Sequence, residues 1–175
     1  MNKNILKKIR TNGYSVGSWL SSFSLDIPEI FSKAGYEWIV VDLEHSSVSI
    51  NQAAEMIRVI DLSGSIPFAR LTSNNSDQIK RVLDSGAKGI IVPNVKSFNQ
   101  AKEIIQNAKY PPQGIRGVGL ARAQGYWKNF REYWNWQKNN ISIIVQIENI
   151  EALNEIDKIL SLKGIDGFII GPYDL

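Results

Sequence analysis

The chain has 175 residues, 43% of them hydrophobic, and a formal net charge of +3 at pH 7, which is typical of a globular protein with one sizeable core. It contains no cysteine, and this excludes structural disulfides, thiolate metal sites and cysteine nucleophiles. The 20 Lys and Arg residues are interleaved with 17 Asp and Glu residues, so the charge gives no argument for a nucleic-acid partner.

The N-terminal stretch MNKNILKKIR is basic but lacks the apolar segment of a signal peptide. No run of about 18 apolar residues suggests a membrane span. We therefore expect a cytoplasmic protein that does not act at a membrane. No internal repeat beyond the βα unit and no flexible linker is visible, and residues 1–175 are expected to form a single domain.

Short apolar runs alternate with amphipathic segments along the chain, which is the pattern of repeated βα units around a parallel sheet. Four of the apolar runs lack alternation, as expected for strands covered on both faces. The sequence predicts strands at residues 15–20, 37–43, 66–70, 88–94, 142–148 and 166–172, and helices at 28–34, 51–62, 76–85, 98–108 and 150–160. Ser49 is a predicted N-cap, and Gly35, Gly64, Gly86 and Gly164 lie where helices should stop.

The segment between the fourth and fifth predicted strands, about 47 residues, is longer than a simple connection. Tyr126, Phe130, Tyr133, Trp134 and Gln137 recur in it at helical spacing and predict a short aromatic helix. Stacking on bases or sugars is an alternative role for these rings, but the helical spacing favours packing or a subunit contact. The loop RGVGLARAQG contains glycines and arginines, yet it does not run from a strand straight into a helix as a phosphate-binding loop does.

Six predicted βα strands are two short of a closed (β/α)₈ barrel, which typically needs ~250 residues. An open doubly wound sheet usually carries a glycine-rich turn after its first strand, whereas SSFSLD follows Leu20 here without a glycine. We therefore predict an α/β fold in which about six of the eight βα units of a TIM barrel are present. The chain is expected to be a fragment or a truncated gene product.

In such a barrel the chemistry is carried by the C-terminal ends of the strands, where the βα loops converge. Five successive predicted strands deliver a polar group to that edge: Asp42, Glu44 and His45, then Arg70, then Asn94 after Pro93, then Gln146 and Glu148, then Asp174. A single carboxylate after a strand is most often a helix cap or a solvated residue. The joint occurrence of these groups indicates a functional site.

Glu148 and Asp174 come from neighbouring strand ends and could share a hard cation such as Mg²⁺ or Mn²⁺, which would offset the repulsion between them. Their spacing alone favours separate caps or surface ion pairs. Arg70 has a planar fork that suits a carboxylate or an enolate. A salt bridge to Asp42 or Glu44 is an equally good interpretation of that arginine.

Histidine is the side chain suited to proton transfer near neutral pH, and His45 is the only one in the chain. A lone histidine is more often structural than catalytic, but this one follows a strand and lies beside two acidic residues. Asp84 could orient the imidazole or merely close a helix. No lysine sits at the end of a core strand, and Lys88 precedes its strand, which argues against a Schiff-base enzyme.

Taken together, these stretches resemble the HpcH/HpaI family of class II pyruvate aldolases, which includes 2,4-dihydroxyhept-2-ene-1,7-dioate aldolases and 2-keto-3-deoxy-sugar-acid aldolases. The matching stretches occur in family order and cover residues 13–175: AGYEWIVVDLEHS, FARLTSNNSDQIKRVLDSGAKGIIVPNVKS, AKYPPQGIRGVG, ARAQGY, VQIENIEAL and GIDGFIIGPYDL. The resemblance implies a TIM barrel of the phosphoenolpyruvate/pyruvate type.

The resemblance also implies a metal and substrate site. Glu148 and Asp174 are expected to hold a divalent cation, which could be Mg²⁺, Mn²⁺ or Co²⁺. Gln146 is expected to line the same site, and the backbone around Gly171 and Pro172 to approach the carboxylate of pyruvate.

The catalytic residues implied by the resemblance are His45, Asp84 and Arg70. The expected reaction cleaves a 4-hydroxy-2-oxo acid to pyruvate and an aldehyde through a metal-stabilised pyruvate enolate. His45, poised by Asp84, is expected to move protons through a bound water, while Arg70 binds the substrate and steadies the developing negative charge.

Full-length family members continue past GPYDL with two more βα units and with C-terminal helices that pack between subunits of a hexamer, so a homo-oligomer is expected. The alternative is a catalytically inactive, truncated relative that acts as a binding or assembly module. Retention of His45, Arg70, Glu148 and Asp174 favours the enzyme, whereas the missing strands favour the module. The aldehyde partner is not indicated by the sequence.

Overall fold

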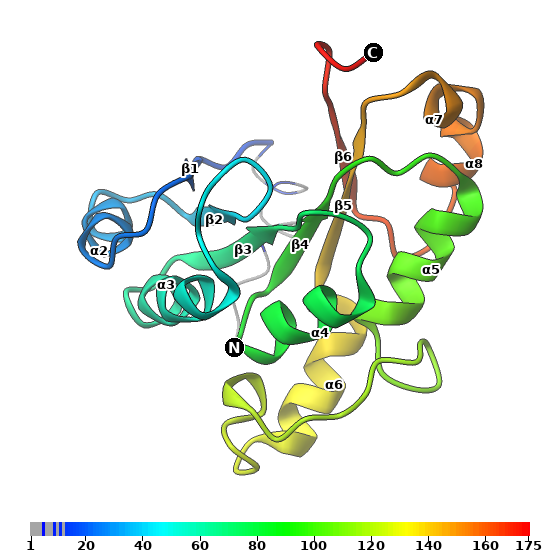
Figure 1. The fold of residues 1–175 in the computed structure, drawn as a ribbon. Helices are drawn as coiled ribbons and strands as arrows, with labels where there is room; N and C mark the ends of the chain where they lie inside the picture. The colour runs from blue at the N-terminus through cyan, green and yellow to red at the C-terminus, as the bar shows by residue number, and fades with distance from the viewer. Residues whose placement is uncertain (1–4, 6–8, 10, 12) are drawn as a thin grey trace.

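The computed structural model describes residues 5, 9, 11 and 13–175. Six parallel strands lie side by side in chain order (Figure 1). They are β1 (Gly17–Leu20), β2 (Trp38–Asp42), β3 (Ile66–Arg70), β4 (Gly89–Val92), β5 (Ser142–Ile147) and β6 (Gly167–Ile170). Each strand pairs with the next strand in the chain, and at least one helix connects the two. The chain therefore forms the incomplete barrel of six βα strands that the sequence predicts.

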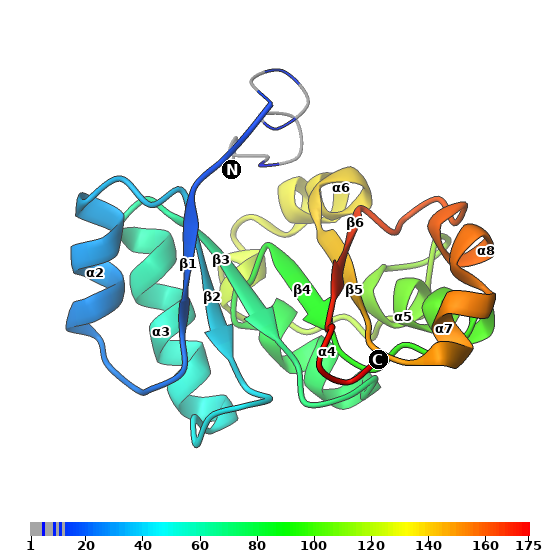
Figure 2. The same cartoon turned by 90° about the horizontal axis from the view of Figure 1, so that it is seen from above.

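The helices connect successive strands, with α2 and α3 at one end of the row of strands and α7 and α8 at the other (Figure 2). They are α2 (Asp26–Lys33), α3 (Ile50–Leu62), α4 (Ser76–Asp84), α5 (Phe98–Ala108), α6 (Phe130–Asn140), α7 (Ile150–Asn154), α8 (Ile156–Leu160) and the 3₁₀ turn η1 (Arg122–Gln124). Among the described residues, none of these helices has both the length and the apolar character that a bilayer crossing requires.

The helix boundaries follow the caps that the sequence predicts. At the start of α3, the Ser49 hydroxyl accepts a hydrogen bond from the backbone N–H of Gln52, whose side chain accepts one from the Ser49 backbone in return. The four glycines predicted to end helices all have positive φ: Gly35 at 95°, Gly64 at 98°, Gly86 at 106° and Gly164 at 118°. Glycine adopts this conformation without a steric penalty, which is why it ends a helix efficiently.

The single helix predicted at 150–160 is wrong, because the structure has two short helices, α7 and α8, at this place. The break falls at Glu155, where φ is −116° and ψ is 11°. The Glu155 carboxylate accepts a hydrogen bond of 2.7 Å from the backbone N–H of Phe98, the first residue of α5. A distant helix therefore uses this side chain, and local periodicity carries no sign of that contact.

The predicted aromatic helix is present as α6, although it begins only at Phe130. Tyr133 is buried, and the Trp134 ring stacks on Tyr110 with ring centroids 5.0 Å apart. These contacts explain both rings by packing. Tyr126 lies before the helix, where its φ of 52° is left-handed.

Both faces of the sheet carry apolar cores. On β2, Ile39 and Val41 belong to the large core that includes helix side chains, while Val40 between them belongs to a smaller cluster with Phe68 and Ile91. All three β2 side chains are fully buried. This confirms the two-sided burial that the unalternating sequence predicts for this strand.

The edge strand β6 differs from the central strands. It pairs with β5 alone among the described strands, and its Phe168 and Ile170 are 45% and 52% exposed. In a closed barrel a further strand would continue the row at this edge. Strand β6, which leads to Asp174, is therefore partly exposed to solvent.

Candidate active site

The first feature of the site is an ion pair between the ends of two neighbouring strands. Asp42 and Arg70 are the last residues of β2 and β3 and are partners in register. Arg70 donates from Nε to Asp42 Oδ1 at 2.8 Å and from Nη2 to Asp42 Oδ2 at 2.6 Å. Its Nη1 lies 3.2 Å from Glu44 Oε2, and its Cζ lies 4.8 Å from the centroid of the Trp19 ring. The salt bridge, one of two alternatives for Arg70, is therefore present.

Asp42 and Glu44 differ in how this cluster shifts their pKa values. Burial acts to raise the pKa of Asp42, but the hydrogen bonds and charge of Arg70 outweigh it and hold this pKa below its usual value. Burial raises the pKa of Glu44, and the positive charge of Arg70 offsets only part of that effect. One acid is thus firmly ionised, while its neighbour takes up a proton more readily.

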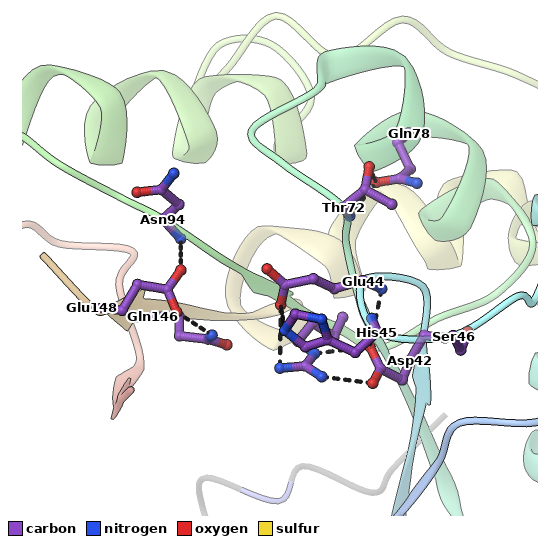
Figure 3. Close-up of polar contacts among 10 residues, drawn as sticks. Asp42, Glu44, His45, Ser46, Thr72, Gln78, Asn94, Gln146 and Glu148 are labelled. Carbon is purple, nitrogen blue, oxygen red and sulfur yellow. Dashed lines mark hydrogen bonds and ion pairs between the residues drawn. The ribbon is translucent and has the colours of Figure 1, made fainter. Parts of the chain in front are cut away.

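The loop after β2 presents the only histidine at the same edge. Asp42 Oδ1 accepts hydrogen bonds from the backbone N–H groups of Glu44 at 3.0 Å and His45 at 3.3 Å, which shapes the turn. The imidazole is 70% exposed, and its Nε2 lies 3.8 Å from Glu44 Oε2 (Figure 3). Asp42 therefore holds both the arginine and the loop that carries His45, a role that strand-end position alone did not predict.

Glu148 follows β5 and is held by two donors, one on each oxygen. Its Oε1 accepts a hydrogen bond of 2.5 Å from the backbone N–H of Asn94, and its Oε2 accepts one of 2.5 Å from Nε2 of Gln146 (Figure 3). Glu148 is 9% exposed and Gln146 is 6% exposed. The amide oxygen of Gln146 is buried and has no hydrogen-bond partner among the described residues.

Asp174 lies in the turn after β6 and faces the same space as Glu148. Its backbone N–H donates to the carbonyl oxygen of Gly171 at 3.3 Å, and Pro172 lies between them in the turn. A Cβ added to Gly171 would lie 3.0 Å from Glu148 Oε2 and 3.6 Å from Asp174 Oδ2. The absent side chain of Gly171 thus leaves a cradle that both carboxylates border. The structure brings together the two acids that the sequence predicts to converge.

A pocket of about 660 Å³ opens at this edge of the sheet, and His45, Glu148 and Asp174 line it together. Apart from Glu44 and Pro93, the rest of its lining consists of polar side chains from the loops after β3 and β4 and from the first two turns of α5: Thr72, Ser73, Asn74, Asn94, Lys96, Gln100 and Glu103. The sequence analysis singled out only Asn94 among these seven, as a strand-end residue. Thr72, Ser73, Asn74 and Lys96 lie in loops, where hydrophobic periodicity gives no signal. Gln100 and Glu103 are polar residues of α5, where the periodicity marks only the apolar side chains.

Of the predicted site residues, His45, Glu148 and Asp174 line this pocket, whereas Arg70, Gln146, Gly171, Pro172 and Asp84 are not part of its lining. Asp84 is the one that the fold places at the opposite edge of the sheet. It is the last residue of α4, and a crossover helix returns its C-terminal end to the start of the next strand, at the opposite edge of the sheet. Asp84 Oδ1 accepts hydrogen bonds from Nη2 of Arg116 at 2.5 Å and from Nε2 of Gln124 at 3.3 Å. The expected contact with His45 is therefore not formed within this chain.

The positions of Lys88 and Lys96 show whether a lysine amine lies at the pocket, as a Schiff-base reaction requires. Lys88 Nζ lies 2.5 Å from Oδ1 of Asp61, near the end of α3, so Lys88 lies at the edge away from the pocket, as predicted. Lys96 does line the pocket, and its Nζ lies 3.7 Å from Oε2 of Glu151. The sequence analysis did not single out Lys96, because it lies four residues beyond the end of β4.

The donor set fits a hard cation. Within residues 5, 9, 11 and 13–175, no three His, Asp or Glu side chains are grouped as a complete metal site. Mg²⁺ is commonly held by one or two carboxylates with waters and substrate at its other positions. Glu148, Asp174 and the cradle above Gly171 match that requirement.

Comparison with known proteins places this chain in a family. The profile of the family described as HpcH/HpaI aldolase/citrate lyase matches residues 15–175, and the chain belongs to that family. It is 34% identical over 170 residues to the 2-keto-3-deoxy-L-rhamnonate aldolase of Escherichia coli O157:H7, matching 97% of this chain and 64% of that protein. The chain thus spans somewhat less than two thirds of this relative's length.

Solved structures of related proteins share the architecture. An HpcH/HpaI aldolase/citrate lyase family protein from Burkholderia cenocepacia J2315 superimposes with a TM-score of 0.88 at 28% identity, over 99% of this chain and 70% of that one. The HpcH/HpaI aldolase from Desulfitobacterium hafniense DCB-2 gives a TM-score of 0.86 at 32% identity, over 99% and 68%. Both comparisons confirm that the six strands are part of a TIM barrel.

Proposed function

We propose that this chain carries the active-site part of a divalent-metal-dependent aldolase that cleaves a 4-hydroxy-2-oxo acid to pyruvate and an aldehyde. The observation that carries the proposal is the convergence of Glu148 and Asp174 on the space above Gly171, in a pocket that also holds His45. Membership of the family and the similarity to a 2-keto-3-deoxy-L-rhamnonate aldolase support the same reaction class.

Glu148 and Asp174 would hold the cation, with Gln146 beside them and the backbone around Gly171 and Pro172 facing the carboxylate of the oxo acid. A bound divalent cation supplies Lewis-acid stabilisation of negative charge on the substrate oxygens. The two hydrogen bonds to Glu148 fix its carboxylate before any ligand arrives, and this preorganisation favours binding.

His45 is the proposed proton acceptor. In cleavage, the C4 hydroxyl loses its proton, the C3–C4 bond breaks, C4 becomes the aldehyde carbonyl, and C3 takes up a proton to form the methyl group of pyruvate. The exposed imidazole in the pocket can receive the hydroxyl proton directly or through a water. Arg70, oriented by Asp42, supplies a fixed positive charge near the site.

The lining of the pocket supports a hydroxylated aldehyde partner. Hydroxyl and amide side chains of Thr72, Ser73, Asn74 and Gln100 line the pocket, and no aromatic side chain lines it among the described residues. Such groups can hydrogen-bond to the hydroxyls of a sugar-derived aldehyde. We therefore take 2-keto-3-deoxy-L-rhamnonate, named in the relative above, as the first substrate to assay.

The proposal is tested by measuring pyruvate release from 2-keto-3-deoxy-L-rhamnonate with Mn²⁺ added and after treatment with EDTA. We expect EDTA, Glu148→Gln and Asp174→Asn each to lower the rate by at least about 100-fold, because they remove the cation or one of its ligands. Glu132→Gln, an exposed acid on α6, is the matched control and should retain the rate. A folded chain whose rate is indifferent to EDTA contradicts the metal-dependent mechanism.

Two further measurements separate the alternatives. Borohydride reduction in the presence of pyruvate should leave the mass of the protein unchanged, whereas an adduct on Lys96 would establish a Schiff-base reaction instead. A folded chain that binds Mn²⁺ but releases no pyruvate would support the inactive binding or assembly module.

We also propose that the protein forms a homo-oligomer. A monomeric mass by light scattering would contradict that part of the proposal.

A further inference from the structure

We propose that Asn94 is a positioning residue for Glu148: its backbone N–H, turned by a left-handed main-chain conformation, clamps the carboxylate and thereby sets the affinity of the site for a divalent cation. The affinity part of this inference rests on the proposed function. The clamp itself concerns only residues of this chain and can be tested without a metal.

The conformation of Asn94 is the first observation. Its φ is 52°, in the left-handed region that residues other than glycine, asparagine and aspartate rarely adopt. The residue directly follows Pro93, beyond the end of β4. An extended backbone here would direct the N–H elsewhere, whereas the observed turn places it 2.5 Å from Glu148 Oε1.

The side chain of Asn94 makes a further contact with the loop after β5. Its Oδ1 accepts a hydrogen bond of 3.1 Å from Nδ2 of Asn149, the residue after Glu148. Asn149 is fixed in turn, since its Oδ1 accepts a hydrogen bond of 2.8 Å from the backbone N–H of Ala152 at the start of α7. Asn94 therefore contacts the loop after β5 twice, once with its main chain and once with its side chain.

The second oxygen of Glu148 shows why a clamp is needed. Gln146 donates to Oε2, and the same oxygen borders the cradle above Gly171. With only one donor, the carboxylate could rotate about its last bond and turn this oxygen away from Asp174. The N–H of Asn94 on Oε1 removes that freedom, because two donors on two oxygens determine the plane of the group.

A residue that merely completes a turn would affect folding stability alone, so the test compares metal affinity with stability. The variants are Asn94→Gly, which keeps the backbone conformation and the N–H, and Asn94→Val and Asn94→Ala, which disfavour that conformation. Tyr126→Val is the matched control, since Tyr126 also has a φ of 52° but is exposed and lies in the loop before α6. Mn²⁺ dissociation constants are measured by calorimetry, and thermal unfolding is followed for each variant.

We expect Asn94→Val to raise the Mn²⁺ dissociation constant by about 10- to 100-fold and Asn94→Ala by a smaller factor in the same direction. Asn94→Gly should stay within about threefold of the unsubstituted protein, and Tyr126→Val should lower the unfolding temperature without changing Mn²⁺ affinity. Unchanged affinity in a folded Asn94→Val or Asn94→Ala protein overturns the inference. Equal losses in Asn94→Gly and Asn94→Val would overturn it as well, because glycine preserves the clamp.

Failure of the proposed function gives a different result. If the unsubstituted protein binds no Mn²⁺, the metal site is refuted, and the clamp is then judged by amide hydrogen exchange of Asn94 in the metal-free protein. Glu148→Ala should speed exchange at that amide by at least about tenfold while leaving the amides of β2 unchanged, because it removes the acceptor. An unchanged exchange rate at Asn94 would refute the clamp independently of any metal.

Discussion

The guanidinium of Arg70 holds the carboxylate of Asp42 at two points, with Nε 2.8 Å from Oδ1 and Nη2 2.6 Å from Oδ2. The two side chains are 14% and 5% exposed, so the pair is largely removed from water. Removal of Asp42 takes away both of these hydrogen bonds and leaves the Arg70 charge with the weaker Glu44 contact at 3.2 Å, in a poorly solvated place. The relationship therefore affects both the stability of the incomplete barrel and the shape of the candidate site.

Asp42→Asn should lower the free energy of unfolding by about 3 kcal/mol, because it leaves the Arg70 charge without its bidentate partner. Urea denaturation of the purified protein measures this difference. The control is Asp77→Asn, whose pair with Lys80 is 62% and 45% exposed and should contribute less than about 1 kcal/mol. Similar losses of unfolding free energy for the two substitutions would show that burial does not strengthen the Asp42–Arg70 pair.

The same pair should make the protein sensitive to acid. The pKa of Asp42 is held below its usual value in the folded state despite its burial, chiefly through Arg70. The Asp42–Arg70 pair therefore contributes its full stabilisation above the unfolded-state pKa of an aspartate, about 4. This contribution is lost as the pH falls through the folded-state pKa of Asp42. We expect the difference in unfolding free energy between the unsubstituted protein and Asp42→Asn to be smaller at pH 3 than at pH 6. A difference that is constant with pH would contradict the assignment.

Gly171→Ala should disturb the site while leaving the fold intact. The added Cβ would lie 2.9 Å from Cβ of Glu148 and 3.0 Å from its Oε2, so the acid must move away from the cradle that it shares with Asp174. We expect Mn²⁺ affinity to fall by about tenfold or more, as measured by calorimetry. Gly117→Ala is the control, because a Cβ there meets no atom within 4 Å. Equal affinities for the two variants would show that the cradle does not bind the cation.

Lys109 gives a prediction in the alkaline range. Its Nζ donates to the carbonyl oxygens of Gln137 at 3.0 Å and Ile141 at 3.3 Å, at the end of α6, and burial lowers its pKa from 10.5 to about 8. Between these two values the unfolded chain binds more protons than the folded chain, so this residue makes stability rise with pH. The unfolding free energy of the unsubstituted protein should therefore increase relative to that of Lys109→Met between about pH 8 and pH 10.

Lys102→Met provides the comparison for that measurement, since Lys102 is an exposed lysine on α5. The change in unfolding free energy caused by Lys102→Met, measured over the same pH range, shows what the loss of an exposed amine contributes. Parallel curves for the Lys109 and Lys102 variants would contradict the buried-lysine interpretation.

Much of the architecture could be predicted because the hydrophobic pattern of each strand or helix indicates which of its faces are buried. The unalternating run at Ile39, Val40 and Val41 indicates a strand covered on both faces, and the caps at Ser49 and Gly64 mark the ends of α3. Misplaced features depend on contacts with distant segments. The break at Glu155 reflects its hydrogen bond to the start of α5, which no local pattern can contain.

The sequence by itself determined which edge of the sheet carries the chemistry. In a parallel βα repeat all strands end on one side, so residues such as His45, Glu148 and Asp174 had to share that edge. Only the tertiary structure decided which of the candidates meet there. It placed Asp84 on the other side with Arg116, and it brought Asn94 onto Glu148. The reason is physical: periodicity records whether a side chain is buried, whereas a hydrogen bond between two loops depends on how separate elements pack against one another.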